Sequence, residues 1–232
     1  MDFDLLVHEA WPAYERVDHD GWVLRYAGGV TKRANSVLPL GRPADLTGAI
    51  EAAEAFYAGK GERSVFSVGP GALAGLDDVL DARGYEVVDP TVLMVGSCDV
   101  APAGHAVRVE RSPWPAWMES WWAVDGRYDD GMPAAEQICT GVPALYAAVE
   151  EDGRAVAVGR GVPQGDTLGI YCMATLPEAR RRGLARSVLR ELLRRSGARS
   201  AYLSVTGRNA AAQGLYRSEG FEARGGYHYR AR

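Results

Sequence analysis

The most informative stretch of the chain is residues 168–185, which read LGIYCMATLPEARRRGLA. Its first half is apolar and β-rich, whereas Leu184, Val188 and Leu192 recur every fourth residue, as on one face of a helix. The pattern therefore predicts a strand that enters a helix through a basic turn containing a glycine. Free N–H groups at a helix start, the positive end of the helix dipole and a residue without Cβ together favour an anion site, usually for phosphate.

Two motifs in this half of the chain resemble signatures of the GNAT superfamily of acyl-coenzyme A N-acyltransferases. The turn Arg180-x-x-Gly183-x-Ala185 is similar to the superfamily's pyrophosphate-binding pattern, Gln/Arg-x-x-Gly-x-Gly/Ala. The closing pattern, Asn-x-x-Ala-x-x-Leu-Tyr-x-x-x-Gly-Phe, is matched by Asn209, Ala212, Leu215, Tyr216, Gly220 and Phe221. Both motifs stand in the superfamily's order and at its usual separation. The resemblance covers about residues 106–232, with a fainter likeness before them.

The resemblance implies which residues hold acyl-coenzyme A. Backbone amides of the turn hold the pyrophosphate in the superfamily, and the matching positions are Arg180, Arg181, Arg182, Gly183, Leu184 and Ala185. Met173 and Thr175 match donors on a strand that splays from its neighbour, residues 201–205, and leaves backbone groups for the pantetheine arm and the acyl carbonyl. Asn209 either caps a helix, which its type favours, or contacts the coenzyme, and both roles can hold. The alternative for the arginines is a solvated helix start, which is a poor place for cations.

The same resemblance makes Tyr216 the candidate general acid that returns a proton to the departing thiolate; the alternative is a packing role on its helix. A general base is less evident, because the predicted strand 168–175 has no Asp or Glu where many superfamily members place a carboxylate. Glu150 and Asp166 are weak candidates, acting through water. Cys172 is possible as a nucleophile, but no His partner is evident, which favours a buried cysteine.

Composition and charge limit the classes of protein to consider. The 232 residues are 47% hydrophobic and 24% charged, which is ordinary globular composition, and no run of about 18 apolar residues predicts a membrane span. The acidic start lacks a signal-peptide profile, so we expect a cytoplasmic protein. Three distant cysteines favour reduced thiols over a disulfide framework or a metal site. Residues 1–100 carry a net charge of −8 and residues 101–232 one of +4, which suits a phosphorylated ligand but is too small an excess for nucleic acid.

The first hundred residues predict an order of elements that the second half repeats. After a helix and lead-in over residues 1–20, that order is strand-strand-helix-strand-helix-strand-strand. The expected elements are a hairpin at 21–40, a helix at 46–57, a strand at 64–68, a helix at 73–83 and a second hairpin at 85–95. Gly84-Tyr85 matches the place of Gly220-Phe221 in the second half, which indicates an internal duplication.

The repeat is incomplete, because the first half lacks an Arg-x-x-Gly-x-Ala turn. We therefore expect a degenerate GNAT-like domain without a coenzyme site over residues 1–100, a linker from Cys98 to His105, and a catalytic GNAT domain over residues 106–232. The expected fold class is α/β (α+β). It is a tandem GNAT-like fold in which each half is a mixed, mostly antiparallel sheet flanked by helices.

Two further segments bear on the acceptor. In the superfamily, the acceptor site is walled by the segment that here carries Trp114, Trp117, Trp121, Trp122, Asp125, Asp129 and Asp130. An aromatic and acidic wall suits a cationic amine, although tryptophans at helical spacing equally fit simple packing. The polar run Arg33-Ala-Asn-Ser either reaches the acceptor site or lines a solvated strand, and we favour the second.

The resemblance implies an N-acetyltransferase that transfers the acetyl group of acetyl-coenzyme A to a primary amine, by direct attack in a ternary complex. The expected acceptor is a small-molecule or peptide amine, with no metal and no nucleic-acid or membrane partner. The competing class is a non-catalytic acyl-coenzyme A-binding regulatory module on the same fold. A third alternative, transfer to a peptide or protein terminus, predicts an open groove in place of a closed pocket.

Overall fold

The computed structural model describes residues 1–126 and 130–232, so Asp129 of the candidate acceptor segment lies outside the described residues. The chain divides into two compact units, Met1–Val92 with Gly225–Arg232, and Leu93–Arg224. Seven α-helices occur within the described ranges, and most strand pairs are antiparallel, which confirms the predicted fold class. Each of these helices is too short or too polar to cross a lipid bilayer.

The first unit packs two helices and a short third one with a five-strand run, in the order β1-β2-β3-β4-β11. Its elements are α1 (Phe3–Ala10), β1 (Glu15–His19), β2 (Trp22–Tyr26), β3 (Val37–Leu38), α2 (Leu46–Ala58), β4 (Val65–Val68) and α3 (Leu76–Ala82). Helix α2 supplies Ile50, Ala53 and Tyr57 to a buried core around Trp22 and Phe66. The last two rings meet edge to face at 5.7 Å.

The last strand of the chain, β11 (Glu222–Ala231), pairs antiparallel with β4, with His228 opposite Val68 and Ala231 opposite Val65. Its residues from Gly225 onward belong to the first unit, although the sequence groups them with the second half. The pairing joins positions more than 150 residues apart, which no local pattern can indicate. The carboxyl-terminal strand therefore completes the sheet of the amino-terminal unit.

The predicted hairpin at residues 85–95 is wrong, because this segment is one strand, β5 (Glu86–Ser97). Asp89 and Pro90 suggest a turn, and Asp89 does adopt a left-handed φ of 48°, but the chain continues in the same direction. The hairpin predicted at residues 21–40 is confirmed, because β2 pairs antiparallel with β3, with Val23 opposite Leu38 and Leu24 opposite Val37. Its second strand is shorter than predicted, with only the two residues of β3, and the structure adds β1, which pairs with β2 through a turn at Asp20 and Gly21.

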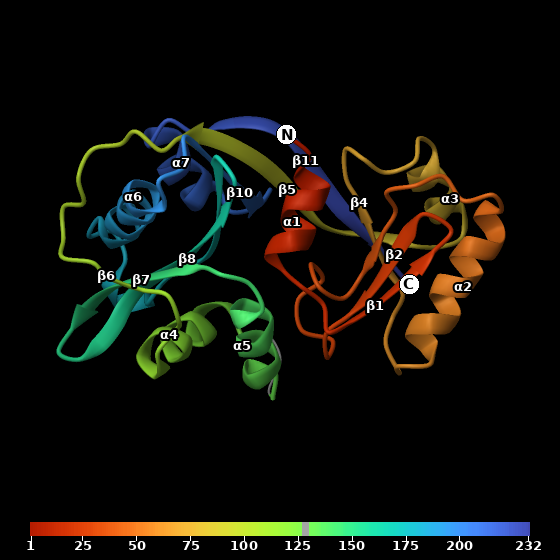
Figure 1. Ribbon diagram of the computed structural model, residues 1–232, viewed down its shortest axis with the longest axis horizontal. Helices are drawn as coiled ribbons and strands as arrows, with labels where there is room; N and C mark the ends of the chain where they lie inside the picture. Colours follow the sequence, from red (N-terminus) through yellow and green to blue (C-terminus); the bar gives the residue numbers. More distant parts are fainter. Residues whose placement is uncertain (127–129) are drawn as a thin grey trace. The chain divides into compact units, whose positions relative to one another are not determined.

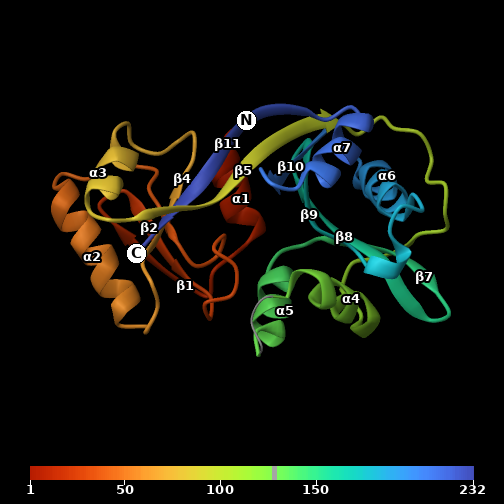
Figure 2. The same ribbon diagram turned by 180° about the vertical axis from the view of Figure 1, so that it is seen from behind.

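The second unit has helices on both faces of an antiparallel run of strands, with α4 and α5 on one face and α6 on the other (Figures 1 and 2). Its strand order is β10-β9-β8-β7-β6, and only the β9–β10 pair in this run is parallel. The elements are β6 (Arg108–Glu110), α4 (Pro115–Asp125), α5 (Met132–Thr140), β7 (Leu145–Glu151), β8 (Arg154–Gln164), β9 (Thr167–Thr175), α6 (Leu184–Ser196), β10 (Ser200–Thr206) and α7 (Ala210–Ser218).

Helix α6 forms because its apolar residues repeat on one face and left-handed glycines bound it at both ends. Leu184, Val188 and Leu192 are buried, as the spacing predicts. Gly183 at the start has φ 80° and Gly197 at the end has φ 70°, conformations that glycine adopts without a Cβ penalty. The sequence therefore fixes where this helix begins, next to the basic turn.

Strands β9 and β10 pair only over part of their length. The parallel ladder runs from Thr167 opposite Ser200 to Ile170 opposite Leu203 and ends there, while the pairing of β9 with β8 continues to Thr175. At Cys172, with φ 52°, a β-bulge shifts the register with β8. The ladder between the two parallel strands ends at Ile170, as the resemblance to the GNAT superfamily implies, and the site described next begins there.

Candidate functional site

A cavity of about 720 Å³ lies in the second unit, between the end of β9, the start of α6 and helix α7. Of the ten residues that the sequence singles out, nine line it: Met173, Thr175, Arg180, Arg181, Gly183, Leu184, Ala185, Asn209 and Tyr216. Their chemistry is divided. Apolar groups such as Met173, Ala174 and Leu215 form one part of the wall, and arginines form another. Such a cavity suits a ligand that is apolar over part of its length and anionic at one end.

The basic turn between β9 and α6 contains two left-handed residues, Arg181 with φ 65° and Gly183 with φ 80°. Gly183 is the residue at which α6 begins, so the first N–H groups of the helix follow it and have no partner within the helix. The Nε atom of Arg180 donates a hydrogen bond of 3.1 Å to the carbonyl of Thr175, which ties the turn to β9. A left-handed arginine costs about 1–2 kcal/mol, and such strain is typical of functional turns.

A glycine is required at position 183 mainly because of its left-handed backbone conformation, and less because a side chain would lack room. A Cβ placed on it would have only one neighbour within 4 Å, the Cε1 atom of His105 at 3.7 Å. The sequence attributes this glycine to close approach of a phosphate, whereas the structure gives the left-handed φ as the reason visible in the protein itself. A branched residue here would strain the turn whatever the ligand does.

Arg182 is the one predicted residue that the structure does not bring to the cavity. Its guanidinium forms two hydrogen bonds with the carboxylate of Glu151, of 2.5 and 3.1 Å. Both side chains are substantially exposed, so the pair contributes little to stability. The sequence does not distinguish the three consecutive arginines. The left-handed conformation of Arg181 directs Arg182 toward β7.

If the cavity holds the acetyl-coenzyme A that the sequence resemblance implies, we predict that Arg181→Ala weakens its binding by about tenfold, because the change removes a charged donor from the cavity wall. The matched control is Arg182→Ala, one residue away, which should change the affinity less than about twofold. Isothermal titration calorimetry at fixed ionic strength measures both. Equal losses from the two variants would show that only overall charge matters and that the turn does not select Arg181.

The opposite wall is helix α7, which presents small residues to the cavity. Asn209 caps it, since its Oδ1 atom accepts a hydrogen bond of 3.1 Å from the N–H of Ala212, which confirms the capping role. Ala211, Ala212 and Gly214 line the cavity on the following turn. These short side chains keep the wall open, a feature that composition alone does not reveal.

Tyr216 lies on α7 with only 6% of its surface exposed, and it lines the cavity. Burial raises the pKa of its phenol to about 12. The ring packs against Phe221 at 6.1 Å, and the hydroxyl has no hydrogen-bond partner among the described residues. The phenol is therefore neutral, and packing fixes the position of its ring on the cavity wall. Its hydroxyl is available to donate a hydrogen bond to a bound group.

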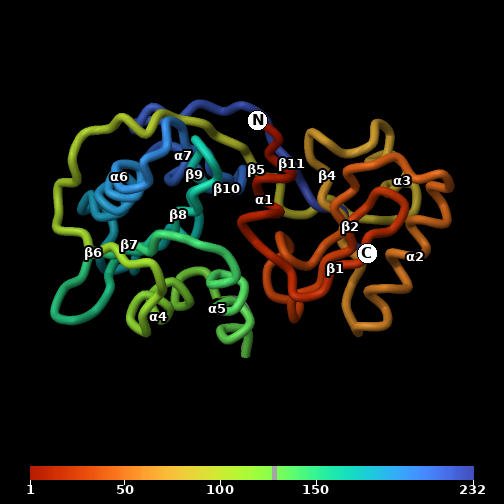
Figure 3. Tube along the Cα trace, viewed as in Figure 1, coloured from red at the N-terminus to blue at the C-terminus, as the bar shows by residue number. Residues whose placement is uncertain are grey.

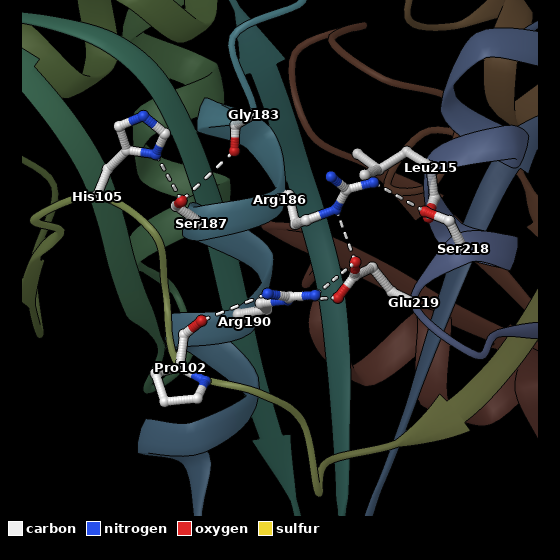
Figure 4. Close-up of polar contacts among 9 residues, drawn as sticks. All are labelled: Pro102, His105, Gly183, Arg186, Ser187, Arg190, Leu215, Ser218 and Glu219. Carbon is white, nitrogen blue, oxygen red and sulfur yellow. Dashed lines mark hydrogen bonds and ion pairs between the residues drawn. The ribbon is translucent and has the colours of Figure 1, made fainter.

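A buried carboxylate joins the two helices that flank the cavity (Figure 4). Glu219, whose side chain is 3% exposed, follows α7 and makes ion pairs of 2.7 Å with Arg186 Nε and 2.6 Å with Arg190 Nε, both on α6. Arg186 also donates to Ser218 Oγ at 3.1 Å, and both of these residues line the cavity. One carboxylate against two guanidinium groups leaves a positive charge at this end. Sequence reasoning missed this cluster, because Glu219 looks like a surface residue after a helix.

The segment between β5 and β6 passes along α6, as Figure 3 shows. Its His105 Nδ1 atom lies 2.9 Å from Ser187 Oγ, and Ser187 is buried one turn after Gly183. Arg190 Nη1 donates to the carbonyl of Pro102 at 3.4 Å. The predicted linker is thus fastened to the helix that begins at the basic turn (Figure 4).

Neither carboxylate that the sequence offers as a general base lies on the cavity. Glu150 accepts a 2.8 Å hydrogen bond from Trp114 Nε1. Asp166 is 79% exposed and sits 3.7 Å from Arg199, at the other end of β9 from the cavity. Cys172 is half-buried, not fully buried as the sequence favours. Its thiol lies beside that of Cys139, and desolvation raises its pKa, which makes it a poor nucleophile.

The tryptophans of α4 mainly pack against the sheet. Trp117 is fully buried and donates from Nε1 to the carbonyl of Ala147 at 3.1 Å, and its ring lies 5.8 Å from that of Trp121. Of the described part of α4, only Val124 lines the cavity. The packing alternative therefore accounts for Trp117 and Trp121, which are buried, whereas Trp114 and Trp122 are only half-buried. Within residues 1–126 and 130–232, no three His, Cys, Asp or Glu side chains group so as to hold a metal ion.

Comparison with known proteins gives a family over almost the whole chain. A family model described as "Probable histone acetyltransferase Rv0428c C-terminal" matches residues 6–230. A Bacillus subtilis (strain 168) protein named "Uncharacterized N-acetyltransferase YobR" is 27% identical over 236 residues, covering 97% of this chain and 95% of that protein.

Solved structures share the fold. A GCN5-related N-acetyltransferase from Kribbella flavida superposes with a TM-score of 0.68 at 19% identity, covering 94% of this chain and 89% of the other. A tandem GNAT protein from the clavulanic acid biosynthesis pathway gives a TM-score of 0.56 at 14% identity, covering 80% of this chain and 69% of the other.

Proposed function

From the chain's membership of the family described as "Probable histone acetyltransferase Rv0428c C-terminal", within the GNAT superfamily, we infer an N-acetyltransferase that uses acetyl-coenzyme A as donor and a primary amine as acceptor. The observation that carries the donor is the cavity of the second unit. It combines an apolar wall from β9 and α7 with the cationic turn at Arg180 and Arg181 and the unpartnered N–H groups at the start of α6.

The residues present fit such a donor. Separation of β9 from β10 beyond Ile170 gives a channel edged by backbone at Met173 and Thr175, which suits the amide-bearing pantetheine arm. The start of α6 and Arg181 suit the pyrophosphate, and Arg186 with Ser218 adds polar donors at the same mouth. Acetyl-coenzyme A would supply the activated thioester, and the protein's part is to bind, orient and stabilise charge.

In the proposed reaction the amine nitrogen attacks the thioester carbonyl carbon directly, a C–N bond forms, the C–S bond breaks and the nitrogen loses a proton. Tyr216 donates a hydrogen bond to the leaving thiolate sulfur. No carboxylate or histidine is among the residues that line the described cavity, so we assign the nitrogen's proton to water. The acceptor then enters as the free amine, and the rate should rise with pH as the amine deprotonates, which for a lysine-like amine occurs near pKa about 10.4.

Thiol release from acetyl-coenzyme A tests this function. The purified full chain is assayed with polyamines, amino-acid amides and a lysine-rich peptide, the last because the family description names a histone acetyltransferase. We expect amine-dependent release with at least one class and, by calorimetry, one donor site per chain, since the first unit lacks the Arg-x-x-Gly-x-Ala turn. Binding without release for any amine would favour the regulatory module, and a stoichiometry of two would contradict a single site.

A further inference from the structure

Glu219 stands at a place that is unfavourable for its own charge. It is the residue that ends helix α7, where the negative end of the helix dipole opposes a carboxylate. Its side chain is only 3% exposed, and a buried carboxylate is costly unless it is paired with positive groups. The partners of Glu219 must therefore explain why a carboxylate lies here.

The backbone around Glu219 is fixed by hydrogen bonds. Its N–H donates to the carbonyls of Leu215 and Tyr216, at 3.2 and 3.0 Å, and the N–H of Phe221 donates to that second carbonyl at 3.0 Å. Gly220 follows with a left-handed φ of 82°, a conformation that glycine adopts without a Cβ penalty. The side chain of Glu219 therefore extends from a rigid helix end, and it points toward α6 (Figure 4).

The two arginines that meet this carboxylate are held in different ways. Arg190 donates to both oxygens of Glu219, from Nε at 2.6 Å and from Nη2 at 3.0 Å, and its Nη1 atom donates to the carbonyl of Pro102. Arg186 Nε lies 2.7 Å from Glu219 Oε1, but its N–H is not directed at an acceptor, so this contact is one between charges. Of the two arginines, only Arg186 lines the cavity of the second unit, and its side chain is 43% exposed.

Arg186 is also poorly placed for its own helix. It is the third residue of α6, in the first turn, where the positive end of the dipole opposes a cation. Its Nη2 atom donates to Ser218 Oγ at 3.1 Å, and within the described chain its Nη1 atom has no acceptor. Glu219 offsets the repulsion at the helix start and restrains a long side chain that has many rotamers. The carboxylate thus holds the guanidinium at the cavity, with N–H groups that no described residue accepts.

We propose that Glu219 is a positioning residue for donor binding, which holds Arg186 so that the remaining N–H groups of its guanidinium donate to a phosphate oxygen of acetyl-coenzyme A. This inference rests on the proposed function, because that function names the donor. Glu219 is not among the residues that line the cavity, so its effect on the donor passes through Arg186. Arg190 holds the carboxylate from the other side, where it is itself tied to the carbonyl of Pro102.

The sign of one substitution separates positioning from simple electrostatics. Glu219→Gln keeps the shape of the side chain and removes its charge. A carboxylate near an anion site repels the anion, so electrostatics alone predicts that this variant binds acetyl-coenzyme A more tightly. Positioning predicts binding that is weaker by about fivefold in calorimetry at fixed ionic strength, because Arg186 is no longer held at the cavity. Glu222→Gln is the matched control: it removes an equal charge from an exposed side chain of the same unit and should bind the donor at least as tightly as the wild type.

A double-mutant cycle shows whether the effect passes through Arg186. In an Arg186→Ala background, Glu219→Gln should cause no further loss of donor affinity, whereas in an Arg190→Ala background it should still weaken binding. Thermal unfolding of the same variants measures the loss of stability, which a purely structural role of Glu219 would cause without this coupling in affinity. The proposal is overturned if Glu219→Gln binds the donor as tightly as the wild type or more tightly, or if it loses affinity equally with and without Arg186.

Nitrogen-15 NMR of the arginine Nε–H groups tests the placement of Arg186 without any donor. We expect a dispersed Arg186 signal in the wild type, identified by its loss in Arg186→Ala, and an averaged signal in Glu219→Gln. An unchanged signal in Glu219→Gln contradicts the positioning role. A wild-type chain that binds no acetyl-coenzyme A in calorimetry contradicts the proposed function instead, so the two failures are distinguishable.

Discussion

Replacing Tyr216 with phenylalanine is expected to lower kcat by about 10²- to 10³-fold, with little change in donor affinity or melting temperature. Among the described residues the hydroxyl has no partner to lose, and the ring that packs on Phe221 is retained. A phenol of pKa about 12 is a weaker acid than a thiol of pKa about 8.5, so complete proton transfer to the departing thiolate is uphill. The structure thus favours a hydrogen bond to the thiolate, and loss of such a donor costs roughly 2.7–4 kcal/mol.

Presteady-state measurement of thiol release gives the chemical step for this variant. Tyr202→Phe is an instructive control from the same unit, because the Tyr202 hydroxyl bonds to Tyr171 and Gln164 away from the cavity. It should lower the melting temperature and leave kcat almost unchanged, the opposite signature. Because the raised pKa keeps Tyr216 protonated below about pH 10, its ionisation should cause no decline of the wild-type rate between pH 7 and pH 9. A fall of less than about threefold for Tyr216→Phe would remove the role assigned to this residue.

The elements around the cavity could be predicted from sequence because their signals are local. The four-residue spacing of Leu184, Val188 and Leu192, with glycines at both ends, gives α6 almost to the residue. Asn209 caps α7 as its type indicates. Nine of ten motif residues meet at one cavity, since the motif spans a single strand-turn-helix and the helix beside it.

What sequence reasoning missed depends on contacts distant in the chain or on single dihedral angles. The left-handed φ of Arg181 turns Arg182 toward Glu151. The sequence cannot distinguish these two residues, because both belong to a run of three arginines. Asp89 and Pro90 are residue types that favour turns, but both lie within β5. The buried pairing of Glu219 with Arg186 crosses between two helices.

The first unit shows the same limit more strongly. The polar residues of the run Arg33-Ala-Asn-Ser favour a solvated strand. Asn35 and Ser36 are buried instead, because they form their hydrogen bonds with the loop and with Arg25 and so leave no polar group unsatisfied. A polar run whose side chains bond to its own backbone has the same composition as an exposed one, and only the fold separates the two.

Gly214→Trp is expected to raise the Kd for acetyl-coenzyme A by at least 100-fold and so to abolish transfer at ordinary donor concentrations. Ala211, Gly214 and Ser218 follow one another at three- and four-residue steps on α7, and all line the cavity. A Cβ at Gly214 meets no atom within 4 Å, so a side chain added there extends into open space and not into the protein. An indole on this face occupies the channel between α7 and β9 that the donor requires.

Gly214→Ala is the matched control, because it places a side chain at the same position without filling the channel. Glycine inside a helix costs about 0.5–1 kcal/mol relative to alanine, so this variant should melt slightly higher than the wild type and bind the donor normally. Calorimetry gives the affinities and thermal unfolding the stabilities. The contrast within one position separates loss of the binding space from loss of the helix. If the folded Gly214→Trp variant binds the donor as tightly as Gly214→Ala, the cavity between β9 and α7 is not the donor site.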